Sequence, residues 1–167
     1  MSAPAGFHLA ELNVGRLLAP PEDPRVAGFM NALDRVNGLG RRMPGFVWMM
    51  EGSGEPGTGN TETAIGGDAH FISNLTVWET VETLEAFVWN TVHRQFYERR
   101  AEWFEVLGRM HFVMWWVPEG HRPTLPEALA RLDHLRENGD SDVAFGWKYL
   151  KEAQAWKTHG CAQAAAE

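Results

Sequence analysis

The sequence predicts an α+β fold of the ferredoxin-like, split βαβ type, and three observations lead to it. Four short stretches have the aromatic and β-branched composition of strands. Two longer stretches carry apolar residues at helical spacing, one after the first strand and one after the third. The resulting order is β-α-β-β-α-β, followed by one more helix, and this order defines the split βαβ fold. We assign one domain to residues 7–150 and a C-terminal tail to residues 151–167.

The first half of the chain supplies a strand, a helix and a second strand. Residues 7–16 alternate as a strand does. Asp23 and Pro24 provide an N-cap and a proline at the first helical position, and apolar residues follow at helical spacing over residues 26–36. Residues 46–50 are aromatic and β-branched, which predicts a short strand.

The second half repeats this pattern with longer elements. Strand composition at residues 70–78 is followed by a helical pattern from Thr80 to Leu107, and residues 110–117 form the strongest strand pattern. The segment 124–127, Thr-Leu-Pro-Glu, predicts a capping box that begins an amphipathic helix. Residues 143–150 fit either a fifth strand or a docking arm.

A glycine-rich segment separates the second and third strands. Residues 52–67 hold six glycines and no lysine, so the segment is not a phosphate-binding P-loop. We interpret it as a mobile hairpin connection or a lid, and a tolerated insertion is the alternative.

Composition excludes several classes of protein. The 167 residues carry 15 basic and 22 acidic side chains, a net charge of -7, which argues against nucleic-acid binding. No signal peptide and no apolar run of 18 residues are present, so we expect a cytoplasmic protein with no membrane span. The single cysteine, Cys161, excludes an intrachain disulfide and a thiolate zinc cluster.

Two segments resemble a known family. One combines Leu-Thr-Val-Trp-Glu at 75–79, Leu-Glu-Ala-Phe at 84–87 and Arg-Arg-Ala-Glu-Trp-Phe at 99–104; the other is Trp-Trp-Val-Pro-Glu-Gly-His-Arg-Pro at 115–123. Together they resemble the domain-of-unknown-function 3291 family, which is similar to the dimeric α/β-barrel superfamily that includes antibiotic-biosynthesis monooxygenases. The resemblance departs at Met49, where relatives often carry a basic residue, and this implies a more apolar pocket.

We expect a homodimer. Two main helices on one face of a four-stranded sheet leave the other face uncovered, while large apolar side chains point to both faces of the strands. A second subunit packed on that open sheet face would bury it, as in a dimeric α/β barrel.

The second helical region and the first strand supply candidate catalytic residues. On a helix His93, Tyr97 and Arg100 share one face. A histidine transfers protons near neutral pH, so His93 is the candidate base. Tyr97 would donate to an enolate or phenolate oxygen, and Asn13 would assist it. Arg100 would bind an acidic group, or else pair with a carboxylate of Glu102 or Glu11.

Aromatic residues and a second histidine complete the candidate site. His111, at the start of the fourth strand, is an alternative base, and His121 is expected to hold a turn. Tryptophans are expected to shape an apolar cavity and bind the substrate: Trp48, Trp89, Trp103, Trp115 and Trp116.

Metal and haem sites are alternatives. His8 and His70 would form a 2-His-1-carboxylate site with Glu11 if the first and third strands brought them together, but no helix-spaced ligand motif supports this, and we predict no metal. The resemblance implies a further alternative, because haem-degrading members of the superfamily place an asparagine, a tryptophan and a histidine around haem. Asn13, Trp89 and His93 are the same residue types in the same elements.

The sequence therefore predicts a small-molecule enzyme without a tightly bound cofactor. The resemblance implies a cofactor-independent monooxygenase, or a cyclase or isomerase, acting on a hydrophobic aromatic or polyketide-like substrate in secondary metabolism. The alternatives are a non-catalytic ligand-binding dimer and a haem-binding or haem-degrading protein.

Overall fold

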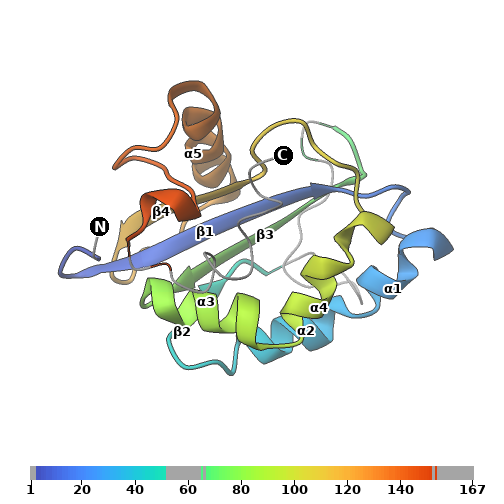
Figure 1. Ribbon diagram of the computed structural model, residues 1–167, viewed down its shortest axis with the longest axis horizontal. Coiled ribbons are helices and arrows are strands. Elements are labelled where there is room, and N and C mark those ends of the chain that lie inside the picture. The colour runs from blue at the N-terminus through green and yellow to red at the C-terminus, as the bar shows by residue number, and fades with distance from the viewer. Residues whose placement is uncertain (1–2, 52–64, 66, 152, 154–167) are drawn as a thin grey trace.

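The computed structural model describes residues 3–51, 65, 67–151 and 153, and four strands in these residues form one antiparallel sheet (Figure 1). The strands are β1 (Phe7–Arg16), β2 (Phe46–Met49), β3 (Phe71–Trp78) and β4 (Phe112–Pro118). Their order across the sheet is β2-β3-β1-β4, so β1 and β3, the first strands of the two βαβ units, lie side by side in the middle of the sheet. The predicted α+β, ferredoxin-like fold is confirmed.

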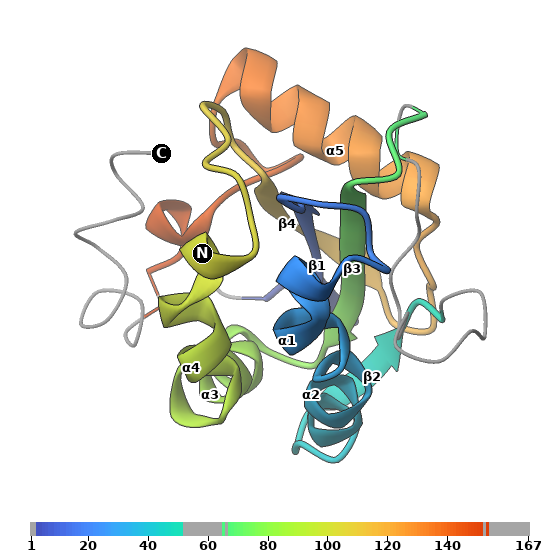
Figure 2. The ribbon, with the colours of Figure 1, turned by 90° about the vertical axis from the view of Figure 1, so that its right-hand side faces the viewer.

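Helices cover both faces of the sheet. Figure 2 shows α1 (Ala27–Met30), α2 (Leu33–Gly40), α3 (Val81–Asn90) and α4 (His93–Glu98) on one side, and α5 (Leu125–Asn138) on the other.

The position of α5 corrects the expected mode of dimerisation. Its buried residues Ala128, Leu132 and Leu135 pack with sheet residues such as Leu12 and Val113 in one core. The sheet face that we expected a second subunit to cover is therefore covered by the chain's own last helix.

The helical pattern from Thr80 to Leu107 is not one helix, so that prediction was wrong. Thr91 is extended (φ -123°, ψ -176°) and separates α3 from α4. Its hydroxyl donates to the Phe87 carbonyl oxygen (2.6 Å) and accepts from the His93 amide (3.1 Å), so the same side chain satisfies the end of α3 and the start of α4.

The predicted first helix is also divided. Asp23 caps it as expected, because its carboxylate accepts from the Arg25 amide at 2.9 Å. A 3-10 turn (Pro24–Val26) follows, and then α1 and α2 form separate helices.

Residues that follow β4 confirm one cap and define the docking arm. The Thr124 hydroxyl accepts from the Glu127 amide at 3.3 Å, but the Glu127 carboxylate bonds His121 at 2.9 Å. His121 thus holds its turn.

Phe145 exchanges both backbone hydrogen bonds with Met114 (2.8 and 2.9 Å) and is fully buried. Residues 143–150 form an arm that pairs with β4 through this single bridge and is not a fifth strand.

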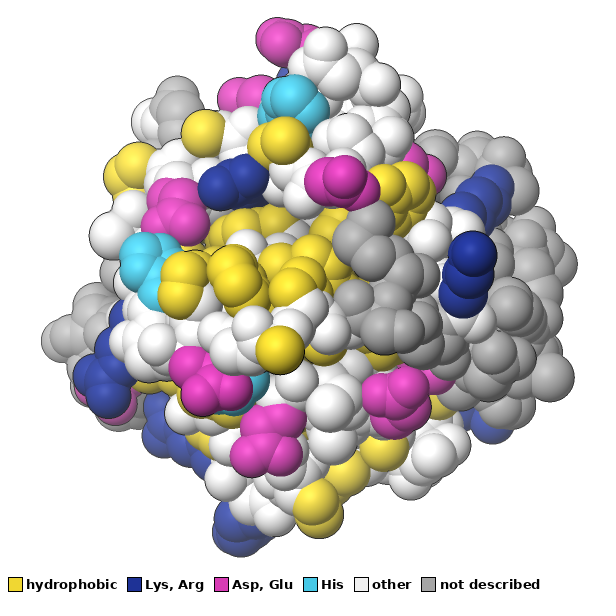
Figure 3. Space-filling model, turned by 90° about the vertical axis from the view of Figure 1, so that its left-hand side faces the viewer, with side chains coloured by type: hydrophobic (Ala, Val, Ile, Leu, Met, Phe, Trp, Pro, Cys, Tyr) yellow, Lys and Arg dark blue, Asp and Glu magenta, His cyan; other side chains and the backbone are white. Residues whose placement is uncertain are grey.

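The surface and the ends of the chain complete the description. Figure 3 shows hydrophobic side chains gathered in a band across one side of the molecule, bordered by charged ones. None of the helices in the described ranges is long and apolar enough to cross a membrane. The glycine-rich segment 52–67 lies outside the described residues except for Ile65 and Gly67, and the tail 151–167 lies outside them except for Lys151 and Ala153.

Candidate functional site

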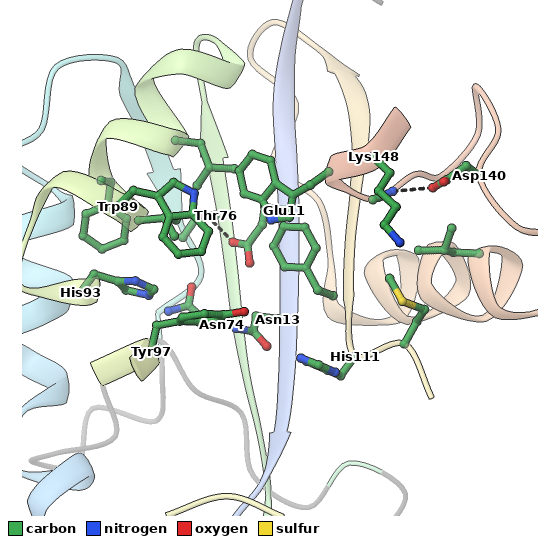
Figure 4. A pocket seen from close by; sticks show the side chains of 18 of the residues that line it. Glu11, Asn13, Asn74, Thr76, Trp89, His93, Tyr97, His111, Asp140 and Lys148 are labelled. Atoms are coloured by element: carbon green, nitrogen blue, oxygen red, sulfur yellow. Dashed lines mark hydrogen bonds between the residues drawn. The ribbon is translucent and has the colours of Figure 1, made fainter. Parts of the chain in front are cut away.

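A cavity lies between the sheet and the helices α2, α3 and α4, on the face opposite α5. It has two adjoining lobes of about 360 and 550 Å³. The smaller lobe is bounded by β1, β3, α3, α4 and the C-terminal arm (Figure 4). The larger lobe extends between the sheet, α2 and the segment after α4. Five residues line both lobes: Asn13, Asn74, His93, Tyr97 and His111. Four of these five are predicted site residues, and the fifth, Asn74, was missed.

Strand register explains the polar floor of the cavity. In the antiparallel pairing of β1 with β3, Asn13 lies opposite Asn74 and Glu11 lies opposite Thr76. Alternate residues of a strand point to the same face, so both pairs point toward the helices and away from α5. Asn13 itself is exposed, which shows that the cavity opens to solvent beside it.

His93 and Tyr97 project from α4, one turn apart, into the junction of the lobes. The His93 ring packs on Phe87 and the Tyr97 ring on Trp89, with centroids 4.9 and 5.2 Å apart. His93 is half-buried, but its Nδ1 atom is enclosed and makes no hydrogen bond with the described residues. Burial lowers the pKa of His93 to about 4, against an opposing effect of the Val88 backbone. The imidazole is therefore neutral at neutral pH.

Arg100 lines the larger lobe and contacts Tyr97 in two ways. Its Nη1 donates to the Tyr97 carbonyl oxygen at 2.9 Å, and its guanidinium lies 4.3 Å from the centre of the Tyr97 ring. The Glu102 carboxylate instead binds Arg99, and Glu11 bonds Thr76. Arg100 thus braces Tyr97 from the far side of its ring.

The structure does not bring the five tryptophans together. Trp89 lines the smaller lobe. Trp48 and Trp115 belong to the core beneath α5. Successive residues of β4 point to opposite faces, so Trp115 and Trp116 lie on different sides of the sheet. Trp103 packs in a separate core near α1, and Trp116 packs beside the arm.

Sequence reasoning considered Glu11 only as a metal ligand or an ion-pair partner and missed its place in the cavity, where it is 7% exposed and lines the smaller lobe. The Thr76 hydroxyl donates to Glu11 Oε2 at 2.8 Å, and the Trp78 indole donates to the Thr76 hydroxyl at 2.9 Å. Burial raises the pKa of Glu11 to about 8, and the Thr76 hydrogen bond opposes that rise. The available signal was a single acidic side chain on an otherwise apolar stretch of strand.

The metal arrangement of His8, His70 and Glu11 does not form. Because β1 and β3 are antiparallel, His8 lies near the start of β1, whereas His70 lies beside Arg16 at its end. His70 Nδ1 is 3.0 Å from the Arg16 guanidinium and 3.2 Å from Asp68. Over the described ranges, no cluster of three or more His, Cys, Asp or Glu residues is placed to hold a metal ion.

Comparison with known proteins establishes the family. The family model described as "Domain of unknown function (DUF3291)" matches residues 8–162. The chain belongs to this family. The DUF3291 match extends from β1 past α5 and includes every residue of the polar floor and of α4.

Other comparisons add a likeness of fold to this DUF3291 chain. No curated protein sequence matches it. A solved structure described as "Putative antibiotic biosynthesis monooxygenase from Nitrosomonas europaea" is similar at 11% identity, with a TM-score of 0.40, over 72% of this chain and 95% of that one. A likeness at this level says nothing about the reaction.

Proposed function

We propose that this DUF3291 protein binds a hydrophobic aromatic or polyketide-like small molecule and transforms it by proton transfer. The observation that carries the proposal is the junction of the two lobes, where a neutral imidazole, a phenol and two amides meet between apolar walls. A mostly apolar pocket with a few convergent polar groups, including groups of shifted pKa, is typical of a small-molecule site.

Each polar group at the junction has a chemical task. His93 is neutral and accepts a proton from an electron-rich ring or an enol. Tyr97 and Asn13 donate hydrogen bonds to the oxygen on which negative charge develops, and Arg100 adds a positive charge beside Tyr97. His111, on the opposite side of the junction, is the alternative base.

The reaction divides into two cases by its use of dioxygen. In a cofactor-independent monooxygenase, the carbanion left after proton removal reacts directly with dioxygen. In a cyclase, the same carbanion attacks another carbon of the same molecule, and in an isomerase it is reprotonated at a different carbon. Neither reaction consumes dioxygen.

A panel of hydroxynaphthalenes tests the proposal. Calorimetric titration should show saturable binding, and a Trp48→Phe control, altered on the α5 face, should bind equally well. Turnover with oxygen uptake identifies a monooxygenase, and turnover without it identifies a cyclase or isomerase. Binding without turnover identifies the non-catalytic ligand-binding protein, and absence of binding by the whole panel contradicts the proposal.

Haem binding is a second candidate because Asn13, Trp89 and His93 all line the smaller lobe. A neutral imidazole that lines the lobe fits an iron ligand, so His93 would hold the haem. Haem would supply oxygen activation. Titration with hemin should then give a Soret band that His93→Ala abolishes and Trp48→Phe preserves. An unchanged spectrum of free hemin contradicts this candidate.

We also propose a homodimer, and the support for it is the family resemblance. Because α5 covers the sheet face, subunits would associate through another surface. Sedimentation equilibrium should give twice 18.8 kDa, and a monomer at micromolar concentration contradicts the proposal.

A further inference from the structure

We infer that Glu11 is the proton donor of the smaller lobe, and that it acts on the carbonyl or enolate oxygen of an uncharged ligand. Its carboxyl holds the acid proton on the oxygen that faces the cavity. This inference rests on the proposed function, and it adds both a residue and the ligand group that the residue recognises.

The location of Glu11 places its carboxyl inside the lobe. Glu11 lies in the middle of β1, flanked across the sheet by Thr76 on β3 and Met114 on β4. Figure 4 shows its carboxyl directed into the lobe between Trp89 and Asn13, with one hydrogen bond to Thr76. Thr76 is its only hydrogen-bond partner among the described residues.

A chain of three side chains fixes where the acid proton sits. An indole N–H can only donate, so Trp78 donates to the Thr76 hydroxyl oxygen. The Thr76 hydroxyl in turn donates its single proton to Glu11 Oε2, 2.8 Å away. Oε2 is thereby an acceptor. With Thr76 as the donor to Oε2, the proton of the neutral carboxyl lies on Oε1, the oxygen that remains for a ligand.

The carboxyl is neutral near pH 7. Burial raises the pKa of Glu11 to about 8, and no neighbouring charge contributes to this shift. The other titratable groups that line the lobe come from α4, the segment before β4, the loop after α5 and the C-terminal arm: His93, Tyr97, His111, Asp140 and Lys148. With Glu11 protonated and His93 neutral, these two groups present no charge to a ligand, which favours a carbonyl compound over a carboxylate or an ammonium group beside them.

A purely structural role explains this arrangement less well. Burial of a carboxyl with a single hydrogen bond costs free energy. An apolar side chain would avoid this cost, as Met114 does at the facing position on β4. Among the described residues, no cation contributes to the pKa shift of the carboxyl. Buried acids kept neutral in an apolar site are suited to donate a proton to a ligand oxygen.

The proton transfer balances without any redox partner. The Glu11 O–H bond breaks and an O–H bond forms on the ligand's carbonyl oxygen, while His93 takes the proton of the adjacent carbon. The C–H electrons form the C=C bond of an enol. The Glu11 carboxylate that remains keeps the Thr76 hydrogen bond, and the reverse steps restore both groups.

Infrared spectroscopy tests the protonation state with a defined probe. At pH 7 the wild type should show a carboxylic-acid C=O band that disappears as the pH rises through about 8. The band should be absent in Glu11→Gln and present in Glu85→Gln, a control at a second buried glutamate that does not line the lobe. In the wild type, the hydrogen bond from Thr76 lowers the pKa of Glu11. Thr76→Val removes that bond and should move the midpoint to higher pH, and Thr76→Ser should restore the wild-type midpoint.

The probe pair is 1-tetralone and tetralin, which share a ring system and differ by one carbonyl group. Saturation with 1-tetralone should shift the acid band to lower frequency, and tetralin should leave it unchanged. In D2O, the wild type should speed exchange of the protons next to the carbonyl. Glu11→Gln should reduce that exchange by about 10²- to 10⁴-fold while 1-tetralone still binds, since an amide also donates a hydrogen bond.

The possible outcomes separate the two proposals. An absent acid band, a band that bound 1-tetralone does not shift, or undiminished exchange in Glu11→Gln overturns the role of Glu11 and leaves the proposed function standing. Failure of the wild type to bind 1-tetralone, or to exchange its protons, overturns the role of Glu11 and removes ketones and enolisation from the proposed function.

Discussion

The two faces of the sheet differ in kind, although the same strands build both. Beneath α5, buried apolar residues from three strands form a closed core that includes Leu12, Trp115 and Leu132. On the opposite face, residues of the same strands line a cavity with a buried acid and a pair of facing asparagines. β1 shows the contrast most directly, because Leu12 lies between Glu11 and Asn13 in the chain and points the other way.

This difference assigns separate tasks to the two faces. Burial of apolar side chains beneath α5 stabilises the fold, at about 25 cal/mol for each Å² removed from water. The cavity face forgoes part of that gain, because space is left open and a carboxyl is desolvated. Changes on the α5 face should therefore alter stability and spare ligand chemistry, and changes on the cavity face should do the reverse.

The largest expected effect is on turnover in His93→Gln. Glutamine keeps much of the size and hydrogen bonding of histidine, so the free energy of unfolding should change little. Loss of the base should reduce turnover by about 10²- to 10⁴-fold. Measurement of kcat on a substrate from the hydroxynaphthalene panel checks this. Full activity in a stable variant would remove His93 from the mechanism and favour His111.

On the α5 face, Trp115→Ala should have the opposite signature. Trp115 is 1% exposed in the core beneath α5, and truncation of a buried tryptophan to alanine costs about 3–5 kcal/mol. Urea denaturation should show that loss, while the fraction that stays folded should keep its affinity for 1-tetralone. A selective loss of affinity without a loss of stability would contradict the division between the faces.

Sequence reasoning predicted the fold better than the site, for physical reasons. The strand at 7–16 and the cap at Asp23 depend on neighbouring residues only, and both are confirmed. The break at Thr91 was missed because its hydroxyl satisfies two helix ends at once, which the apolar spacing does not reveal. The sequence predicted that α5 is a helix, but it did not predict which face of the sheet the helix covers.

The site depends on contacts between distant segments. Tyr97 and His93 were found from spacing along one helix. The role of Glu11 depends on its register with Thr76, 65 residues away, and on the orientation of the Trp78 indole. No pattern of neighbouring residues encodes this strand register or this indole orientation. Glu11 was therefore predicted only as a partner for Arg100 or as a metal ligand.

The pH dependence of stability should separate Glu11 and His93, the two groups of the smaller lobe whose pKa values are strongly shifted. The pKa of Glu11 is raised from 4.5 to about 8, so folding retains a proton that the unfolded chain loses, and stability falls as pH rises across that range. The pKa of His93 is lowered from 6.5 to about 4, so stability rises with pH between those values.

The two effects oppose each other between pH 4.5 and 6.5, and above that range only Glu11 acts. Stability should therefore decline from pH 6.5 to 8 by up to about 1.4 kcal/mol per pH unit. Urea denaturation at a series of pH values measures this. Glu11→Gln should abolish the decline, and His93→Gln should make it begin near pH 4.5. A decline of equal slope in Glu11→Gln would assign it to another group.

The smallest expected effects come from the caps of two helices on opposite faces. Thr124 caps α5, with its hydroxyl accepting from the Glu127 amide at 3.3 Å, and Thr80 caps α3, accepting from the Thr83 amide at 3.3 Å. Replacement of either threonine with alanine should cost about 1 kcal/mol of unfolding free energy. Because α3 lines the smaller lobe and α5 contributes only its end, Thr80→Ala should also weaken 1-tetralone binding, whereas Thr124→Ala should leave that affinity unchanged. Equal losses of affinity in both variants would show that the two faces are coupled through the sheet.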